Sequence, residues 1–516
     1  MGLDGASLPL IQAWRDSGKL PGFSRLIKDG GWGGLRSTVP VISPSAWTSI
    51  FTGVTPAKHG IFGFVKRREN SYFPRPIGTY DVQVPLLWDI LTQHNLRSAW
   101  VTIPFVYPPS PINGIMITGL GTPSKKSEFV YPPTLKEDLL RRYPNFDVDF
   151  NEYKIELSRD IAESLPKIEE QTNASIELFE DLTADKNNRL VAGVFRAPDV
   201  VQHYRIHEPN ALLPFYERFD ELIQRCLASL SADDVLIVCS DHGFREVKRT
   251  FHISNWLENL GLLEMKEKPF LAKIGLSAET FQRIFAGLGL KNLTWRVKRS
   301  RAAETIVTFL PRSDIAPINW NRTKAYYIGK EGGGTIYLNM VGREPEGSVK
   351  KGPESKELSS MLLAAAREVT DPATGKKPVG EAFETAEFYE QCAPDAPEIL
   401  LVENEQDDYA FSGRYNYTKE LFSDVTRSGA HSIEGILFMG GGRVLSKRIR
   451  SACVWDLSPT ILHLLGVPIP LHIDGRVLGE ALRGFSPEQV LRPPSGSQEI
   501  QHIAEAVELL KQSGKV

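Results

Sequence analysis

Six residues with metal-binding side chains stand at the ends of short apolar runs in this sequence: Asp4, Asp199, His203, Asp241, His242 and His431. Imidazole nitrogen and carboxylate oxygen are ligands of zinc, which takes about four of them. Six such residues are too many for one catalytic ion that keeps an open position. They fit two ions about 4 Å apart, the arrangement used for in-line displacement at phosphorus. Each residue alone would indicate a helix cap or a hydrogen-bonded core side chain, whereas the combination predicts a two-metal site.

Spacing supports this prediction at two places in the chain. Asp199 and His203 are four residues apart, so one helical turn would point both the same way. Asp241 and His242 are adjacent, and on an extended chain they would face opposite sides. We therefore expect a sharp turn at this point, which Gly243 would permit.

A candidate nucleophile lies near the start of the chain. Ser43 directly precedes Pro44, and proline favours the first position of a helix. The positive end of the helix dipole would stabilise an alkoxide and a phosphate at Ser43. Considered alone, Ser43 would be a helix cap. Ser45, two residues later, is a competing nucleophile.

Alternating strand-like and helix-like stretches predict the elements that hold these residues. Runs this short and this continuously apolar are typical of strands buried on both faces. Amphipathic stretches at Pro214–Leu230 and Leu358–Val369 are expected to be helices between them. The pattern predicts an α/β fold, a three-layer α/β/α sandwich with a mostly parallel central sheet, whose functional side chains gather at the carboxyl ends of the strands. The apolar runs are Ala99–Phe105, Val191–Phe195, Val235–Ser240, Ile399–Val402 and Ile436–Met439.

The chain is expected to form one discontinuous catalytic core, residues 1–256 and 313–490. Residues 257–312 are predicted to be a helical insertion, and residues 491–516 a linker and a peripheral helix. The insertion is either a solvated helical face or a lid that meets an anionic substrate or a membrane surface. Its basic residues are Lys291, Arg296, Lys298, Arg299 and Arg301.

Composition excludes several classes of protein. Of the 516 residues, 60 are Lys or Arg and 63 are Asp or Glu, a net charge of −3, so no stable nucleic-acid partner is expected. The four cysteines lie far apart and form no zinc ribbon. The sequence shows neither a transmembrane run nor a secretory signal, so a cytoplasmic location is expected.

Taken in order, the motifs resemble those of the alkaline phosphatase superfamily. They are D-G at Asp4, S-P at Ser43, T-G-x-x-P-x-x-H-G-I over Thr52–Ile61, D-x-x-x-H at Asp199, D-H-G at Asp241 and G-x-H ending at His431. Within the superfamily, the chain is most similar to the type I phosphodiesterase/nucleotide pyrophosphatase branch over roughly residues 1–480.

The resemblance implies a ligand set for each metal ion. Zinc is expected, with manganese and magnesium as alternatives. His59 matches a motif residue with a structural role, and Asp474 matches one with no assigned chemistry. One ion would be bound by Asp4, Ser43, Asp241 and His242, and the other by Asp199, His203 and His431.

The activity implied is metal-dependent hydrolysis of phosphodiester or pyrophosphate bonds in a small phosphorylated substrate, through a phosphoserine on Ser43. The alternatives are a phosphomonoesterase or a phosphoglycerate mutase-like phosphotransferase of the same superfamily, and a non-catalytic binding protein on this scaffold. The natural substrate and the oligomeric state stay open.

Two departures from the branch pattern bear on the site. Phe64 stands where an asparagine normally donates to a phosphoryl oxygen, which leaves the preference for diesters or monoesters open. Only Met1, Gly2 and Leu3 precede Asp4, so either the start is truncated or the first strand is unusually short, and a weakened sheet edge is expected. The replacement phosphate-binding residues are expected among Lys66, Arg67, Arg68 and Ser45.

Overall fold

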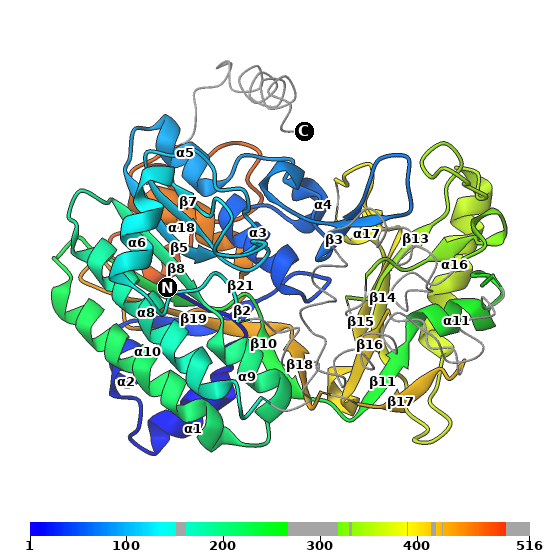
Figure 1. Ribbon diagram of the computed structural model, residues 1–516, viewed down its shortest axis with the longest axis horizontal. Coiled ribbons are helices and arrows are strands. Elements are labelled where there is room, and N and C mark those ends of the chain that lie inside the picture. The colour runs from blue at the N-terminus through cyan, green and yellow to red at the C-terminus, as the bar shows by residue number, and fades with distance from the viewer. Residues whose placement is uncertain are drawn as a thin grey trace.

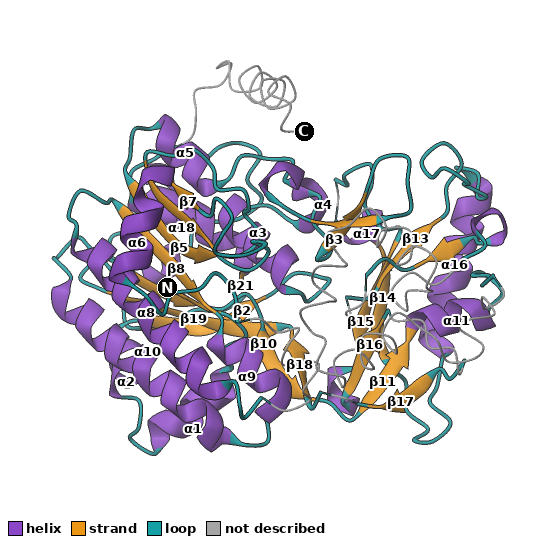
Figure 2. Ribbon diagram, viewed as in Figure 1, coloured by secondary structure: helices purple, strands orange, loops and turns teal. Residues whose placement is uncertain are grey.

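The computed structural model describes residues 1–150, 161–266, 318–329, 333–389, 391–413, 419–425 and 427–491. Two lobes lie side by side (Figure 1). Helices and strands alternate in the larger lobe, which contains the N-terminus, whereas the smaller lobe is built mainly of strands (Figure 2).

A ten-stranded sheet forms the centre of the larger lobe. Most neighbouring strands in it are parallel; β19 is antiparallel to both neighbours, and β7 is antiparallel to β6. The predicted mostly parallel sheet is confirmed. In spatial order the strands are β20 (Lys447–Arg448), β2 (Gly31–Arg36), β19 (Glu434–Gly440), β9 (Leu236–Cys239), β1 (Gly2–Leu3), β8 (Leu190–Phe195), β5 (Ser98–Ile103), β6 (Gly114–Thr118) and β7 (Val130–Tyr131), with β21 (Ala452–Cys453) also beside β2.

The first strand corrects an expectation. Strand β1 is short, as predicted, but it lies in the middle of the sheet and not at its edge. Gly2 pairs with Val194 of β8 on one side and with Cys239 of β9 on the other, both in parallel register. A two-residue strand is sufficient here because both neighbours hydrogen-bond to it. Glycine is required at position 2, since a Cβ there would lie 2.4 Å from the Trp47 ring.

Helices cover both faces of this sheet, which confirms the three-layer sandwich. Along β19, Ile436 and Phe438 contribute to one apolar core, and the alternate residues Leu437 and Met439 contribute to the other. The first face is covered by α1 (Leu8–Asp16), α2 (Pro21–Asp29), α6 (Lys136–Arg142), α8 (Leu165–Ala184), α9 (Ala197–Arg205) and α10 (Pro209–Ser229), and the second by α3 (Ser43–Thr52), α5 (Leu87–Gln93) and α18 (Leu457–Leu464).

The smaller lobe has a hydrophobic core of its own, which the sequence analysis did not separate from the catalytic core. The run Ile399–Val402 belongs to this lobe and is antiparallel to both neighbours, so its assignment to the parallel sheet is wrong. The elements are β12 (Ala325–Tyr326), β13 (Thr335–Leu338), β15 (Ile399–Glu403) and β14 (Val379–Glu384) in one sheet, β16 (Tyr409–Ser412), β11 (Arg249–His252) and β17 (Phe422–Asp424) in another, and helices α11 (Ile253–Asn259), α16 (Pro353–Glu368) and α17 (Thr385–Phe388).

Five small elements lie near the junction of the lobes. Strand β10 (Gly243–Glu246) pairs antiparallel with β18 (Gly429–Ser432), a hairpin joins β3 (Val65–Arg67) to β4 (Pro74–Pro76), and α4 (Pro56–His59) follows α3. Most of the predicted insertion 257–312, and the predicted C-terminal helix, lie outside the described residues, so the domain limits stay predictions. Of the helices in the described part of the chain, none has the length and apolar character needed to span a bilayer.

Candidate active site

Three central strands bring the predicted site residues to one edge of the sheet. Asp4 directly follows β1, Asp241 lies two residues after β9, and Asp199 lies in the first turn of α9, just after β8. Because β8, β1 and β9 are neighbours and parallel, their carboxyl ends meet. The chain can pass this edge of the sheet only with glycine at position 243, because a Cβ there would lie 2.1 Å from the Glu434 carbonyl oxygen. Close approach of the backbone, and not a positive φ, explains why glycine stands at the expected sharp turn.

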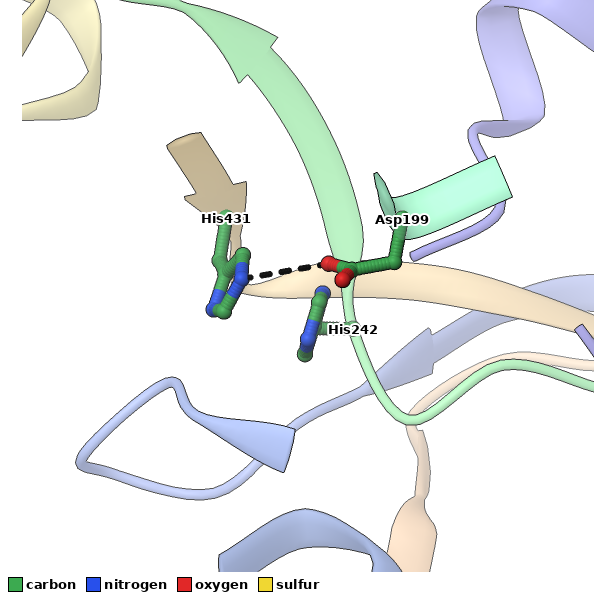
Figure 3. Close-up of side chains that lie close together, drawn as sticks. All are labelled: Asp199, His242 and His431. Atoms are coloured by element: carbon green, nitrogen blue, oxygen red, sulfur yellow. Dashed lines mark ion pairs between the residues drawn. The ribbon is translucent and has the colours of Figure 1, made fainter. Parts of the chain in front are cut away.

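Two groups of side chains present their ligand atoms within 4.8 Å of one another: Asp4, Asp241 and His242, and Asp199, His242 and His431. Asp199, His242 and His431 reach this point from three different segments of the chain (Figure 3). The structure thus places His242 in both groups, whereas the resemblance assigned it to one ion.

Distances within the groups match those between ligands of one small ion. His242 Nε2 lies 3.1 Å from Asp241 Oδ2 and 3.7 Å from Asp4 Oδ1. Asp199 Oδ1 lies 3.4 Å from His431 Nε2 and 3.5 Å from His203 Nε2. Two atoms bound tetrahedrally at about 2.1 Å lie roughly 3.4 Å apart. His203 is therefore beside the second group, although it is not one of its three closest members.

The hydrogen bonds of the three histidines leave the same ring nitrogen available. In each ring Nδ1 faces a backbone carbonyl oxygen at 3.0 to 3.1 Å, so Nδ1 carries the proton and Nε2 is a bare acceptor. Metal-binding histidines are commonly oriented in this way. The acceptors are Gly429 for His203, Gly243 for His242 and Val41 for His431.

Each carboxylate of the first group has one oxygen held and one oxygen free of hydrogen bonds. Trp47 Nε1 donates to Asp4 Oδ2 at 3.0 Å, and Gly5 N–H donates to Asp241 Oδ1 at 3.3 Å. The other oxygens, Asp4 Oδ1 and Asp241 Oδ2, are buried without a hydrogen-bond partner, as are Asp199 Oδ1 and His431 Nε2. Buried polar atoms are nearly always paired, so these four fit a bound cation.

Electrostatics also favour a cation at this place. Burial and the neighbouring Asp199 raise the pKa of Asp4 to about 7, and burial together with Asp4 raises the pKa of Asp241 well above its usual range. Burial would also raise the pKa of Asp199, but its interactions with the adjacent His203 and His431 rings outweigh burial and hold that pKa low. The surrounding side chains therefore stabilise the charge of only one of three adjacent carboxylates, and bound cations would stabilise the other two.

Ser43 is the first residue of α3 and points at the first group. Its Oγ lies 3.1 Å from His242 Nε2, and only 4% of the residue is exposed. The residue at the N-cap position is Ile42, which makes no side-chain cap. Ser43 is therefore not the cap that its sequence alone would suggest; its hydroxyl lies between the positive end of α3 and the cluster of potential ligands.

Comparison with known proteins identifies the family of this chain. A sequence model of the type I phosphodiesterase / nucleotide pyrophosphatase family matches residues 1–291, more than half of the chain. The chain belongs to this family. It is accordingly a phosphoric ester hydrolase, and the matched residues include Asp4, Ser43, Asp199 and Asp241 but not His431.

Solved structures of known proteins share the fold of this chain. Phosphonoacetate hydrolase from Sinorhizobium meliloti 1021, in complex with phosphonoformate, is 15% identical over 90% of this chain and 94% of its own, with a TM-score of 0.52. Human ectonucleotide pyrophosphatase / phosphodiesterase 5 is 12% identical over 93% of this chain and 98% of its own, with a TM-score of 0.50. At these identities the likeness shows the fold alone. No curated protein sequence matched the chain.

Two further motif residues of this phosphodiesterase family member have structural partners. His59 is fully buried; its Nδ1 accepts from Ile61 N–H at 3.1 Å and its Nε2 lies 2.9 Å from Ser49 Oγ. Asp474 accepts from Thr55 N–H at 3.0 Å and pairs with Lys58. Both therefore hold the turn that contains α4, which gives Asp474 the role that its sequence left unassigned.

The side chains of three of the four residues expected to bind phosphate have other partners. Ser45 is fully buried and donates to Ile61 O at 2.7 Å, so its hydroxyl is engaged within the core, and its role at the site stays a prediction. Lys66 pairs with Asp395 at 2.7 Å and Arg67 with Glu344 at 3.1 Å, which ties the β3–β4 hairpin to the smaller lobe. Arg68 is exposed, and its phosphate-binding role stays a prediction.

Two supporting residues had escaped sequence analysis. Arg196 is buried, with Nε 3.9 Å from Asp4 Oδ2 and Nη2 3.8 Å from Asp199 Oδ2. Gln202, between the two ligand candidates of α9, donates to Gly5 O at 2.7 Å and so holds the loop after Asp4. The only sequence signal for either residue was its position three residues from Asp199, Arg196 before it and Gln202 after it.

Proposed function

We propose that this enzyme hydrolyses phosphodiester or pyrophosphate bonds with two divalent metal ions and with Ser43 as the nucleophile. One ion would be held by Asp4, Asp241 and His242, and the other by Asp199, His203 and His431. The observation that carries the proposal is the position of Ser43 Oγ, 3.1 Å from the one histidine shared by both groups.

Divalent ions at these groups would supply the positive charge that favours the Ser43 alkoxide and stabilises the departing oxygen. The helix dipole of α3 adds to this effect, because Ser43 lies in its first turn. After the hydroxyl has lost its proton, a bond forms between Ser43 Oγ and phosphorus, and the bond from phosphorus to the leaving oxygen breaks. Water then cleaves the phosphoserine and restores the hydroxyl.

Two observations support a small phosphorylated substrate: the accessibility of the site, and the ligands bound to a hydrolase of similar fold. His203 and His431 are the more exposed members of the site, with 16% and 15% of their side chains accessible, so substrate would enter beside them. The hydrolase of similar fold was solved with two small phosphonates, phosphonoformate and phosphonoacetate. The family supports diesters over monoesters, and zinc is the expected metal.

A substrate screen tests the proposal. Wild type, Ser43→Ala and the matched control Ser45→Ala would be assayed with p-nitrophenyl phosphate, bis-p-nitrophenyl phosphate and a nucleotide phenylphosphonate, after elemental analysis of each protein. We expect the diester or the phosphonate to be preferred, and Ser43→Ala to lose at least about 10³-fold in kcat. Ser45→Ala should stay within about threefold of wild type, since its hydroxyl bonds only within the core.

Other outcomes would redirect the assignment. Preference for the monophosphate would favour the phosphomonoesterase alternative. A fully active Ser43→Ala protein would exclude the phosphoserine. If a protein that retains its metals hydrolyses none of the three substrates, a non-catalytic binding function is favoured.

A further inference from the structure

The segment that leads into the nucleophile is fastened by residues from the far end of the chain. Val39 to Ile42 form the lead-in to α3, and Ile42 is extended, with φ −143° and ψ 144°. Since no side-chain cap holds the start of α3, the position of Ser43 Oγ depends on where this lead-in is fixed.

Tyr389 fixes the beginning of the lead-in. Its hydroxyl accepts from Val39 N–H at 3.0 Å and donates to Val39 O at 2.9 Å, across 350 residues of sequence. Tyr389 immediately follows α17 of the smaller lobe and is 5% exposed. Its ring packs in a small apolar cluster with Val39, Ala57, Phe62, Ala396 and Leu400.

His431 fixes the end of the same lead-in. Its Nδ1 donates to Val41 O at 3.0 Å, and its ring stacks on His242 with 3.7 Å between centroids. His242 in turn contacts Ser43 Oγ. The lead-in is therefore held at one end by a potential metal ligand and at the other by a tyrosine that belongs to no metal group.

We propose that Tyr389 is a positioning residue for the reaction: through its two hydrogen bonds to Val39, the smaller lobe holds Ser43 in line with the phosphorus atom. This inference rests on the proposed role of Ser43. Ala393 N–H, four residues beyond Tyr389, donates to Ala57 O at 2.7 Å, so the same segment also docks on the turn that follows α3. Figure 1 shows α17 on the side of the smaller lobe that faces α4 and β3.

The effect expected is on the chemical step. Tyr389→Phe keeps the ring and the apolar cluster but leaves Val39 without either hydrogen bond. A displacement of the nucleophile by an ångström can cost about 100-fold in rate. We expect kcat for bis-p-nitrophenyl phosphate to fall about 10- to 100-fold, with KM within about twofold and with metal content unchanged.

Tyr409→Phe is the matched control. Tyr409 is a fully buried tyrosine of the same lobe, whose hydroxyl donates to Asp371 at 3.0 Å and contacts Thr374. Both variants should melt at lower temperature than wild type, but only Tyr389→Phe should lower kcat when assayed well below its melting temperature. If both variants lose stability and neither loses kcat, Tyr389 is merely structural and the inference is overturned.

Binding of orthovanadate provides a readout that does not require turnover. Vanadate accepts a serine oxygen as a fifth ligand, so its affinity reports the alignment of Ser43. We expect Tyr389→Phe to weaken vanadate binding at least about tenfold and Tyr409→Phe to leave it unchanged; equal binding by both would overturn the inference. An active Ser43→Ala protein would instead contradict the proposed function, in which Ser43 is the nucleophile, and on which the inference rests.

Discussion

His59 lies in the turn beside α3, and His242 and His431 lie at the candidate metal site; the hydrogen bonds at these two places differ. At His59 one ring nitrogen accepts from a backbone N–H and the other faces a serine hydroxyl, so both are satisfied within the protein. At His242 and His431 the Nδ1 proton is given to a carbonyl oxygen, and Nε2 faces carboxylates. Burial is therefore a poor guide to function here; the partner of the second nitrogen separates a structural histidine from a candidate ligand.

The largest expected effect is a loss of both bound metal and hydrolytic activity when His431 is replaced. We expect His431→Ala to lose at least one equivalent of bound metal and at least about 10³-fold in kcat/KM, because it removes a nitrogen that faces Asp199. Elemental analysis and hydrolysis of bis-p-nitrophenyl phosphate measure both. His59→Asn, the matched control, should retain wild-type metal content. Equal metal loss in the two variants would contradict the assignment of His431 as a metal ligand and His59 as a structural histidine.

The next effect concerns the pH dependence of stability. Burial lowers the pKa of His59 to about 3, so between about pH 6.5 and 3 the unfolded chain binds a proton that the folded chain does not. Stability should therefore fall as the pH drops through this range. Relative to His59→Asn, wild type should lose about 2 kcal/mol between pH 7.5 and pH 5.

Urea unfolding of wild type and His59→Asn at the two pH values measures this difference. Other groups titrate equally in both proteins and cancel. A stability difference that stays constant between the two pH values would show that His59 is not held neutral by its pocket.

The smallest effect is expected at Asp474. Asp474→Asn removes the charge that pairs with Lys58 but keeps an oxygen for Thr55 N–H. Because both side chains are partly exposed, at 24% and 21%, the loss should be at most about 1 kcal/mol. A small fall in melting temperature with unchanged kcat is expected. A large loss of kcat would instead show that this turn contributes to catalysis.

Local patterns were sufficient for much of the fold. Continuous apolar runs predicted β5, β8, β9 and β19, and the amphipathic stretches predicted the cores of α10 and α16. The same rule failed for β15, because an apolar run records burial on both faces and not the sheet to which the strand belongs. The central position of β1 was equally invisible, since strand order follows from long-range pairing.

By itself, the sequence determined which chemistry was available: aspartates and histidines at the ends of buried strands, and a serine at the start of a helix, followed from local spacing. Tertiary structure decided which of them meet. Pairing of β18 with β10 places His431 opposite Phe244, two residues from His242, and the smaller lobe brings Tyr389 to Val39. Contacts across more than 180 residues depend on packing of whole elements, and no local pattern encodes that packing.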